Sequence, residues 1–76
     1  MNAERRRSLR SALKYLAAVA SILNQVRDKE SDCMDNYPEN LQETDRYAAM
    51  EDAVESLDEA IENIDDAVKN IEAAIK

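Results

Sequence analysis

The N-terminal arginines are the first residues of this 76-residue chain whose type and spacing suggest chemistry. Arg5, Arg6 and Arg7 are consecutive, and Arg10 and Lys14 follow at helical spacing. Guanidinium groups at the start of a helix, where backbone N–H groups have no partner, are suited to clamping phosphate. The alternative is that this basic segment pairs with acidic side chains of a neighbouring helix. The sequence leaves both interpretations open.

A second group of polar and aromatic side chains surrounds the only proline of the chain. Arg46 is an isolated cation in an acidic stretch, and Tyr47 follows it directly. An arginine beside an aromatic ring suits an anionic ligand that can stack, such as a nucleotide. The alternative is a surface contact of Arg46 with Asp45 or Glu43, with Tyr47 capping the core. The candidate ligand-binding residues are therefore Arg46, Tyr47, Arg27, Asn36, Tyr37 and Gln42, together with Arg6 and Arg10 at the N-terminus.

The composition removes most enzymatic chemistry. The chain has no histidine and a single cysteine, Cys33, which excludes zinc-finger ligation, Ser-His triads and an intramolecular disulfide. It has no glycine, which excludes the phosphate-binding loops of nucleotide enzymes. Its 17 carboxylates are expected on solvated helix faces rather than in a metal site. We therefore expect no enzymatic activity, no metal and no cofactor.

Charge is distributed unevenly along the chain, whose net charge is −7. Residues 1–31 carry seven cations against three carboxylates, whereas residues 32–76 carry three cations against fourteen carboxylates. An acidic protein repels phosphates at long range, so duplex nucleic acid is not an expected partner. No apolar run approaches the ~20 residues that span a bilayer, and no leader peptide is recognisable. We expect a cytoplasmic protein with no membrane partner.

Two amphipathic helices must position these residues. After residue 44 the sequence repeats every seven residues, with apolar side chains at alternating spacings of three and four, which is typical of a left-handed bundle. In the N-terminal half a similar repeat runs through Leu9, Ala12, Leu16, Val19, Leu23 and Val26. Its apolar arc is wide enough to contact more than one helix. The expected oligomer core is Leu9, Leu13, Leu16, Val19, Leu23, Met50, Val54, Leu57, Ile61, Ile64, Val68 and Ile71.

We predict an all-α fold, a single antiparallel helical-hairpin domain over residues 1–76. The expected elements are a helix at about 3–30, a connection at 31–43 with a short helical turn, and a helix at about 44–75. Asn2 and Thr44 are expected N-caps, and Asn36 has capping-box spacing to Glu39. Because two helices alone expose apolar surface, the hairpins are expected to form a homodimer or higher oligomer, in the simplest case a four-helix bundle.

Residues 35–64 contain a motif that a generic coiled coil does not produce. The pattern is D-N-x-P-E-x-L-Q-x-S-x-R-x-x-x-M-x-x-A followed by acidic heptads. It is matched by Asp35, Asn36, Pro38, Glu39, Leu41, Gln42, Arg46, Met50 and Ala53, with Thr44 where serine is usual. This pattern resembles that of short helical proteins, mostly uncharacterised, encoded by phages and mobile elements of Gram-positive bacteria. The resemblance implies a phage-type origin and a hairpin fold, and it carries no established activity.

Three functions fit this resemblance. Some small helical phage proteins sequester nucleotide signals of bacterial immune systems such as CBASS and Thoeris. By analogy at the level of the fold, the leading hypothesis is an anti-defence protein that sequesters a small nucleotide-derived immune signal. The alternatives are an inhibitor that binds a host protein through its acidic face, and a purely structural coiled-coil adaptor. That acidic face comprises Glu51, Glu55, Asp58, Glu62, Asp65 and Asp66.

Overall fold

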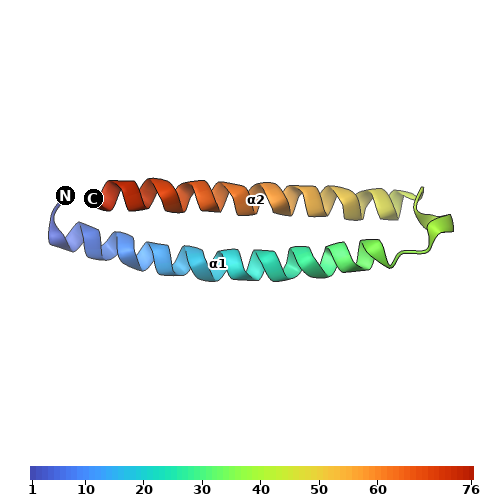
Figure 1. The fold of residues 1–76 in the computed structure, drawn as a ribbon, viewed down its shortest axis with the longest axis horizontal. Helices are drawn as coiled ribbons and strands as arrows, with labels where there is room; N and C mark the ends of the chain where they lie inside the picture. Colours follow the sequence, from blue (N-terminus) through green and yellow to red (C-terminus); the bar gives the residue numbers. More distant parts are fainter.

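Two long antiparallel helices make up the molecule (Figure 1). The computed structural model describes residues 1–76. Helix α1 spans Ala3–Asp35, the 3-10 helix η1 spans Glu39–Leu41, and α2 spans Asp45–Ile75. The hairpin measures 59 × 15 × 13 Å, with both termini at one end and η1 at the other. The predicted all-helical hairpin is confirmed, and neither helix has a stretch long and apolar enough to cross a lipid bilayer.

Each long helix begins at the polar residue that the sequence predicts. Asn2 precedes α1, and its Oδ1 accepts a hydrogen bond from the N–H of Arg5 at 2.8 Å. Thr44 precedes α2, and its Oγ1 accepts from the N–H of Tyr47 at 3.4 Å and donates to the carbonyl of Leu41 at 2.7 Å. Each cap satisfies a backbone N–H that the helix leaves free. Both expected N-caps are confirmed.

The cap of α2 leads to a prediction for stability. We expect Thr44→Ala to lower the free energy of unfolding by about 1 kcal/mol, because the N–H of Tyr47 loses its acceptor. Thr44→Ser keeps the hydroxyl and is expected to retain nearly all of that stability. Urea denaturation followed by circular dichroism measures both variants. An equal loss in both would contradict a capping role for the hydroxyl.

Helix α1 continues to Asp35, whereas the sequence predicts an end near residue 30. Asn36 closes it, because its backbone N–H and its side-chain Nδ2 both donate to the carbonyl of Asp32. The predicted capping box of Asn36 and Glu39 is wrong, since the Asn36 amide serves α1 and Pro38 precedes η1 without a side-chain cap. A chain without glycine lacks the residue that most readily ends a helix at positive φ, and no residue here has positive φ.

The interface between α1 and α2 is the only apolar core of the hairpin, and it leaves no residue fully buried. The half-buried repeat of α2 is Tyr47, Met50, Val54, Leu57, Ile61, Ile64, Val68, Ile71 and Ile75. The half-buried repeat of α1 is Arg6, Leu9, Leu13, Leu16, Ala20, Leu23, Arg27, Glu30 and Met34. Of the expected repeat, Ala12 is also half-buried, whereas Val19 and Val26 are turned away from α2 and are 42% and 46% exposed. One helix covers only part of the wide apolar arc, and leucines bury more area there than valines or alanines.

Candidate functional site

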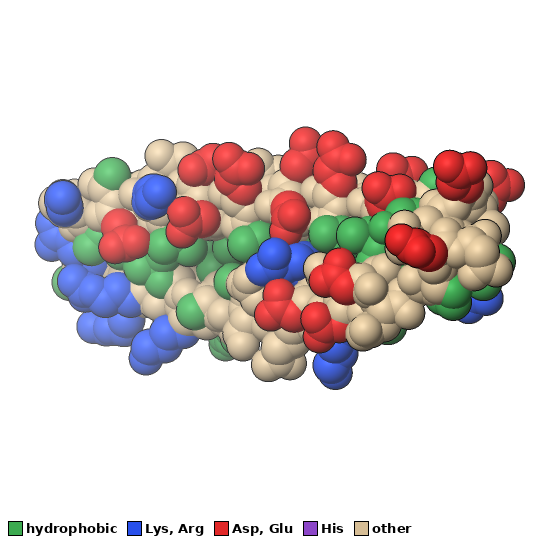
Figure 2. Space-filling model, turned by 45° about the vertical axis from the view of Figure 1, so that its right-hand side comes forward, with side chains coloured by type: hydrophobic (Ala, Val, Ile, Leu, Met, Phe, Trp, Pro, Cys, Tyr) green, Lys and Arg blue, Asp and Glu red, His purple; other side chains and the backbone are tan.

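The N-terminal cations gather at the end of the hairpin where the two termini lie (Figure 2). Arg6 is half-buried, and its Nε donates to the carbonyl of Ile75 at 3.2 Å in the last turn of α2. None of the five N-terminal cations forms an ion pair. The cations that do form ion pairs are Arg27 and Lys69. The proposed pairing of this segment with acidic side chains of α2 is therefore wrong. The exposed members are Arg5, Arg7, Arg10 and Lys14.

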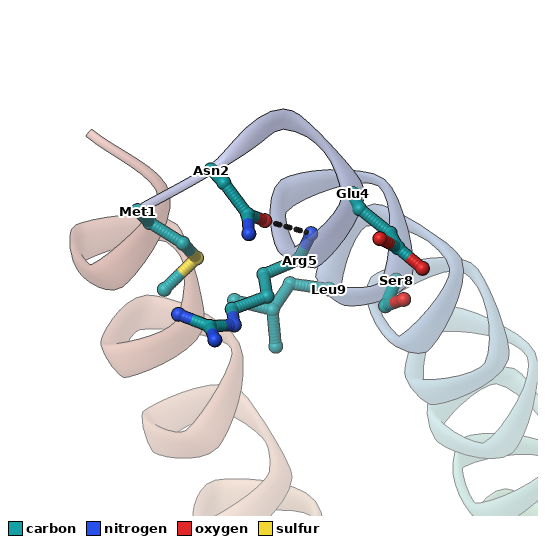
Figure 3. A pocket seen from close by; sticks show the side chains of 6 residues that line it. All are labelled: Met1, Asn2, Glu4, Arg5, Ser8 and Leu9. Carbon is teal, nitrogen blue, oxygen red and sulfur yellow. Dashed lines mark hydrogen bonds between the residues drawn. The ribbon is translucent and has the colours of Figure 1, made fainter.

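A hollow of about 510 Å³ opens beside the first turns of α1 (Figure 3). The Arg5 guanidinium lies on the same side as the Met1 side chain, whereas the Glu4 carboxylate points away from both. The positive end of a helix and an unpaired guanidinium together favour a bound anion. The volume falls in the range of about 300–1,000 Å³ that small-molecule sites occupy. The lining residues are Met1, Asn2, Glu4, Arg5, Ser8 and Leu9.

At the opposite end of the hairpin, the candidate residues Tyr37, Gln42 and Tyr47 come together. The rings of Tyr37 and Tyr47 have centroids 5.6 Å apart and planes tilted by 45°. Gln42 Nε2 donates to the carbonyl of Tyr37 at 3.4 Å. Arg46 lies one residue before Tyr47, is exposed, and forms no ion pair. The alternative contact of Arg46 with Asp45 or Glu43 does not form an ion pair, so the guanidinium is free to meet a ligand. The other part of that alternative is confirmed, because Tyr47 is half-buried in the row of α2 that meets α1.

Arg27 and Asn36 do not join this group. Arg27 lies in the α1–α2 interface, where its Nη1 is 3.4 Å from Asp58 Oδ1 and its Nε is 3.1 Å from Asp28 Oδ1. The Arg27 Nε is enclosed without a well-aligned hydrogen bond, so the contact with Asp28 is electrostatic rather than directional. Asn36 caps α1. The sequence analysis followed the row of residues that includes Val19 and Val26, and it therefore missed Arg27. Arg27 belongs to the adjacent row, seven and fourteen residues after Ala20 and Leu13.

The position of Arg27 leads to a second prediction for stability. We expect Arg27→Leu to raise the free energy of unfolding by about 1–2 kcal/mol, because an apolar side chain fits the interface repeat better than a charged one. Asp58 is 53% exposed and remains solvated without its partner. Lys14→Leu, on the exposed side of α1 away from that interface, is the control and should change stability by less than about 0.5 kcal/mol. Lower stability of Arg27→Leu in urea would contradict this prediction.

The carboxylates of α2 form an acidic edge along the hairpin (Figure 2). Asp58 pairs with Arg27, and Asp65 pairs with Lys69 at 3.2 Å. The hydrogen bond and the negative charge of Asp65 hold the pKa of Lys69 above its ordinary value. No group of three or more acidic or cysteine side chains is arranged to hold a metal ion. The other members of the predicted acidic face form no ion pair with a lysine or arginine. They are Glu51, Glu55, Glu62 and Asp66.

The titratable side chains are spread over the surface of the hairpin. Each of them is at least partly exposed. The unpaired arginines lie at two ends of a rod 59 Å long, and a single hairpin does not bring them together. No family model matches the chain, and neither a curated protein nor a solved structure shows significant similarity to it.

Proposed function

We propose that this protein is a non-enzymatic binding protein that sequesters a small nucleotide-derived anion at the ends of its hairpin. The supporting observation is that five of its six arginines have no carboxylate partner, although the chain carries 17 carboxylates. Guanidinium groups bind phosphate through paired, charge-assisted hydrogen bonds, and these five are not occupied by internal acids. The five are Arg5, Arg6, Arg7, Arg10 and Arg46.

The aromatic rings at the turn favour a nucleotide over a simple phosphate. The rings of Tyr37 and Tyr47 lie 5.6 Å apart, and Arg46 directly precedes Tyr47 in the chain. A base stacks on such rings while an arginine holds its phosphate. The negative field of the rest of the molecule repels long polyanions, which favours a small ligand over duplex nucleic acid. In the phage-type setting that the motif of residues 35–64 suggests, the protein acts in the host cytoplasm. It lowers the free concentration of an immune signal there.

Isothermal titration calorimetry against cyclic dinucleotides and ADP-ribose derivatives tests this function. We expect at least one of these ligands to bind at micromolar concentration, while inorganic phosphate at the same concentration gives no comparable heat. The binding should weaken as salt is raised, because the contacts are ionic. An absence of heat with every ligand at high micromolar concentration would contradict the proposal, and so would equal binding of inorganic phosphate.

The acidic edge of α2 supports a second candidate function, inhibition of a host protein with a basic cleft. Four carboxylates on this edge have no internal cation, so they are available to an external one. The test is a pull-down from host lysate with the unsubstituted protein and with the triple variant Glu51→Gln, Glu55→Gln, Glu62→Gln. A partner retained by the first and lost by the second favours inhibition. If neither a partner nor a nucleotide binds, the structural adaptor remains the better description.

A further inference from the structure

One flank of α1 carries a stripe of large apolar side chains that α2 does not cover. Tyr15, Val19, Ile22 and Val26 are 75%, 42%, 59% and 46% exposed. They follow one another at spacings of four, three and four residues, so they lie in a single row along the helix. Apolar side chains at these spacings are typical of a helix–helix interface. This row is separate from the one that meets α2.

A row of alanines on α2 lies on the same side of the hairpin. Ala53, Ala60, Ala67 and Ala74 flank the α2 interface on one side, and the acidic row of Asp58 and Asp65 flanks it on the other. The acidic row lies beside the flank of α1 that carries Ala17 and Asn24. Two observations place it there, the Arg27–Asp58 ion pair and a hollow lined by Ala17, Asn24, Asp58 and Asp65 among others. The alanine row lies on the flank of α2 opposite the acidic row, and the Val19 row lies on the flank of α1 opposite Ala17 and Asn24. The two rows therefore share the other side of the hairpin.

We call this side the apolar face and define it by Tyr15, Val19, Ile22, Val26, Ala53, Ala60, Ala67 and Ala74. Charge is depleted around it, because the next row of α2 after the alanines is also uncharged. That row consists of Ala49, Ser56, Asn63 and Asn70. In a chain with 36% charged residues, two adjacent uncharged rows on one helix make this the side of α2 with the least charge, as is typical of interface surfaces.

We propose that a second copy of this chain packs on the apolar face, with the turns of the two hairpins at opposite ends. The area that the single chain leaves exposed supports a second copy. A compact monomer of 8.6 kDa exposes roughly 4,700 Å², whereas this hairpin exposes 5837 Å². The excess is about 1,100 Å², and a standard protein interface buries about 800 Å² per partner. Face-to-face packing of two hairpins provides that burial and gives the chain its first fully buried residues.

The distribution of charge supports the orientation. The half of the hairpin nearest the turn, residues 24–55, carries ten carboxylates against three cations, a net charge of −7. The half with the termini carries seven of each and is neutral. Packing with both turns at one end would place −7 against −7, whereas turns at opposite ends place each acidic half beside the arginine-rich start of the other chain. Long-range repulsion therefore favours opposite ends.

This orientation has a consequence for ligand binding, although the proposal does not depend on it. The N-terminal arginines of one copy come to the same end of the bundle as Tyr37, Arg46 and Tyr47 of the other. The two candidate binding groups are far apart in one hairpin and adjacent in the pair. Two equivalent sites then form, one at each end of the assembly, as the two-fold symmetry of a homodimer requires.

Sedimentation equilibrium of the unsubstituted protein without ligand tests the second copy. We expect a dimer at micromolar concentration, and Val19→Glu should weaken it about a hundredfold by placing a charge at the centre of the apolar face. Ser21→Glu adds the same charge two residues away, on the side of α1 opposite the apolar face, and should leave the dimer intact. A folded monomer at micromolar concentration overturns the proposal. Equal dissociation of the two variants also overturns it.

The single cysteine allows the orientation to be measured in the unsubstituted protein. The same measurement tests for the second copy if Val19→Glu fails to fold. Cys33 is exposed near the turn and accepts a spin label. With turns at opposite ends, two labels lie about 40 Å apart, because each is about 14 residues from the middle of α1. With turns together, the labels lie closer than about 20 Å. Pulsed electron spin resonance should give the longer distance, and a short distance or no intermolecular coupling overturns the proposal.

Discussion

Leu16→Asp is expected to unfold most of the protein at room temperature. Leu16 lies in the middle of the α1–α2 interface, beside Ile61, Ile64 and Val68 of the facing helix. The substitution removes the burial of one leucine and places a carboxylate in its position, and the two effects together cost about 3–5 kcal/mol. A domain of this size has about 4–11 kcal/mol in total, and a hairpin without a fully buried residue lies at the low end.

Circular dichroism at 222 nm measures this loss, with urea titration to give the midpoint. Ala18→Asp is the matched control, because it introduces the same side chain two residues away on an exposed position of α1. It should cost less than about 1 kcal/mol, which is the helix propensity difference between the two residues. If Leu16→Asp keeps full helicity and an unchanged midpoint, the α1–α2 interface described above does not hold the hairpin together.

The double variant Arg5→Gln, Arg10→Gln is expected to lower the affinity for an anionic nucleotide at least a hundredfold. Both side chains are exposed and unpaired, so the substitutions remove contacts to the ligand without breaking an internal one. A hydrogen bond to a charged group contributes about 1.5–3 kcal/mol, and losing two of them corresponds to a factor of about a hundred or more. Calorimetry with the ligand that binds the unsubstituted protein measures the change.

The control for this variant removes the same net charge elsewhere. Lys29→Gln, Lys69→Gln lowers the charge by two units without touching the arginines and should change affinity by less than about threefold at physiological salt, where distant charges are screened. Arg46→Ala should keep the helicity and weaken binding about tenfold, as expected for one lost contact. Full affinity in the Arg5, Arg10 variant would move the site to the turn, and full affinity in Arg46→Ala would confine it to the N-terminal arginines.

Features that depend on neighbours in the chain were predictable from the sequence. The seven-residue repeat of α2 correctly predicted seven residues of the α1–α2 interface, from Met50 to Ile71, because helical spacing alone puts them on one side. Asn2 and Thr44 were recognised as caps because a side-chain oxygen reaches an N–H only three residues away. The grouping of Tyr37, Gln42 and Tyr47 followed from their closeness to the turn.

Features that depend on a choice between partners were decided only by the tertiary structure. The wide apolar arc of α1 offers several rows of residues that could pack against α2. In the structure α2 packs against the leucine row and leaves Val19 exposed. Arg27 forms an ion pair with Asp58 and does not join the residues at the turn. Helix α1 ends at Asp35, next to the Asn36 amide that caps it, and not where its apolar repeat ends. The sequence determined which surfaces each helix has to offer. Which row of the wide apolar arc of α1 meets α2 depends on competition between contacts far apart in the chain, and the spacing along α1 alone does not decide it.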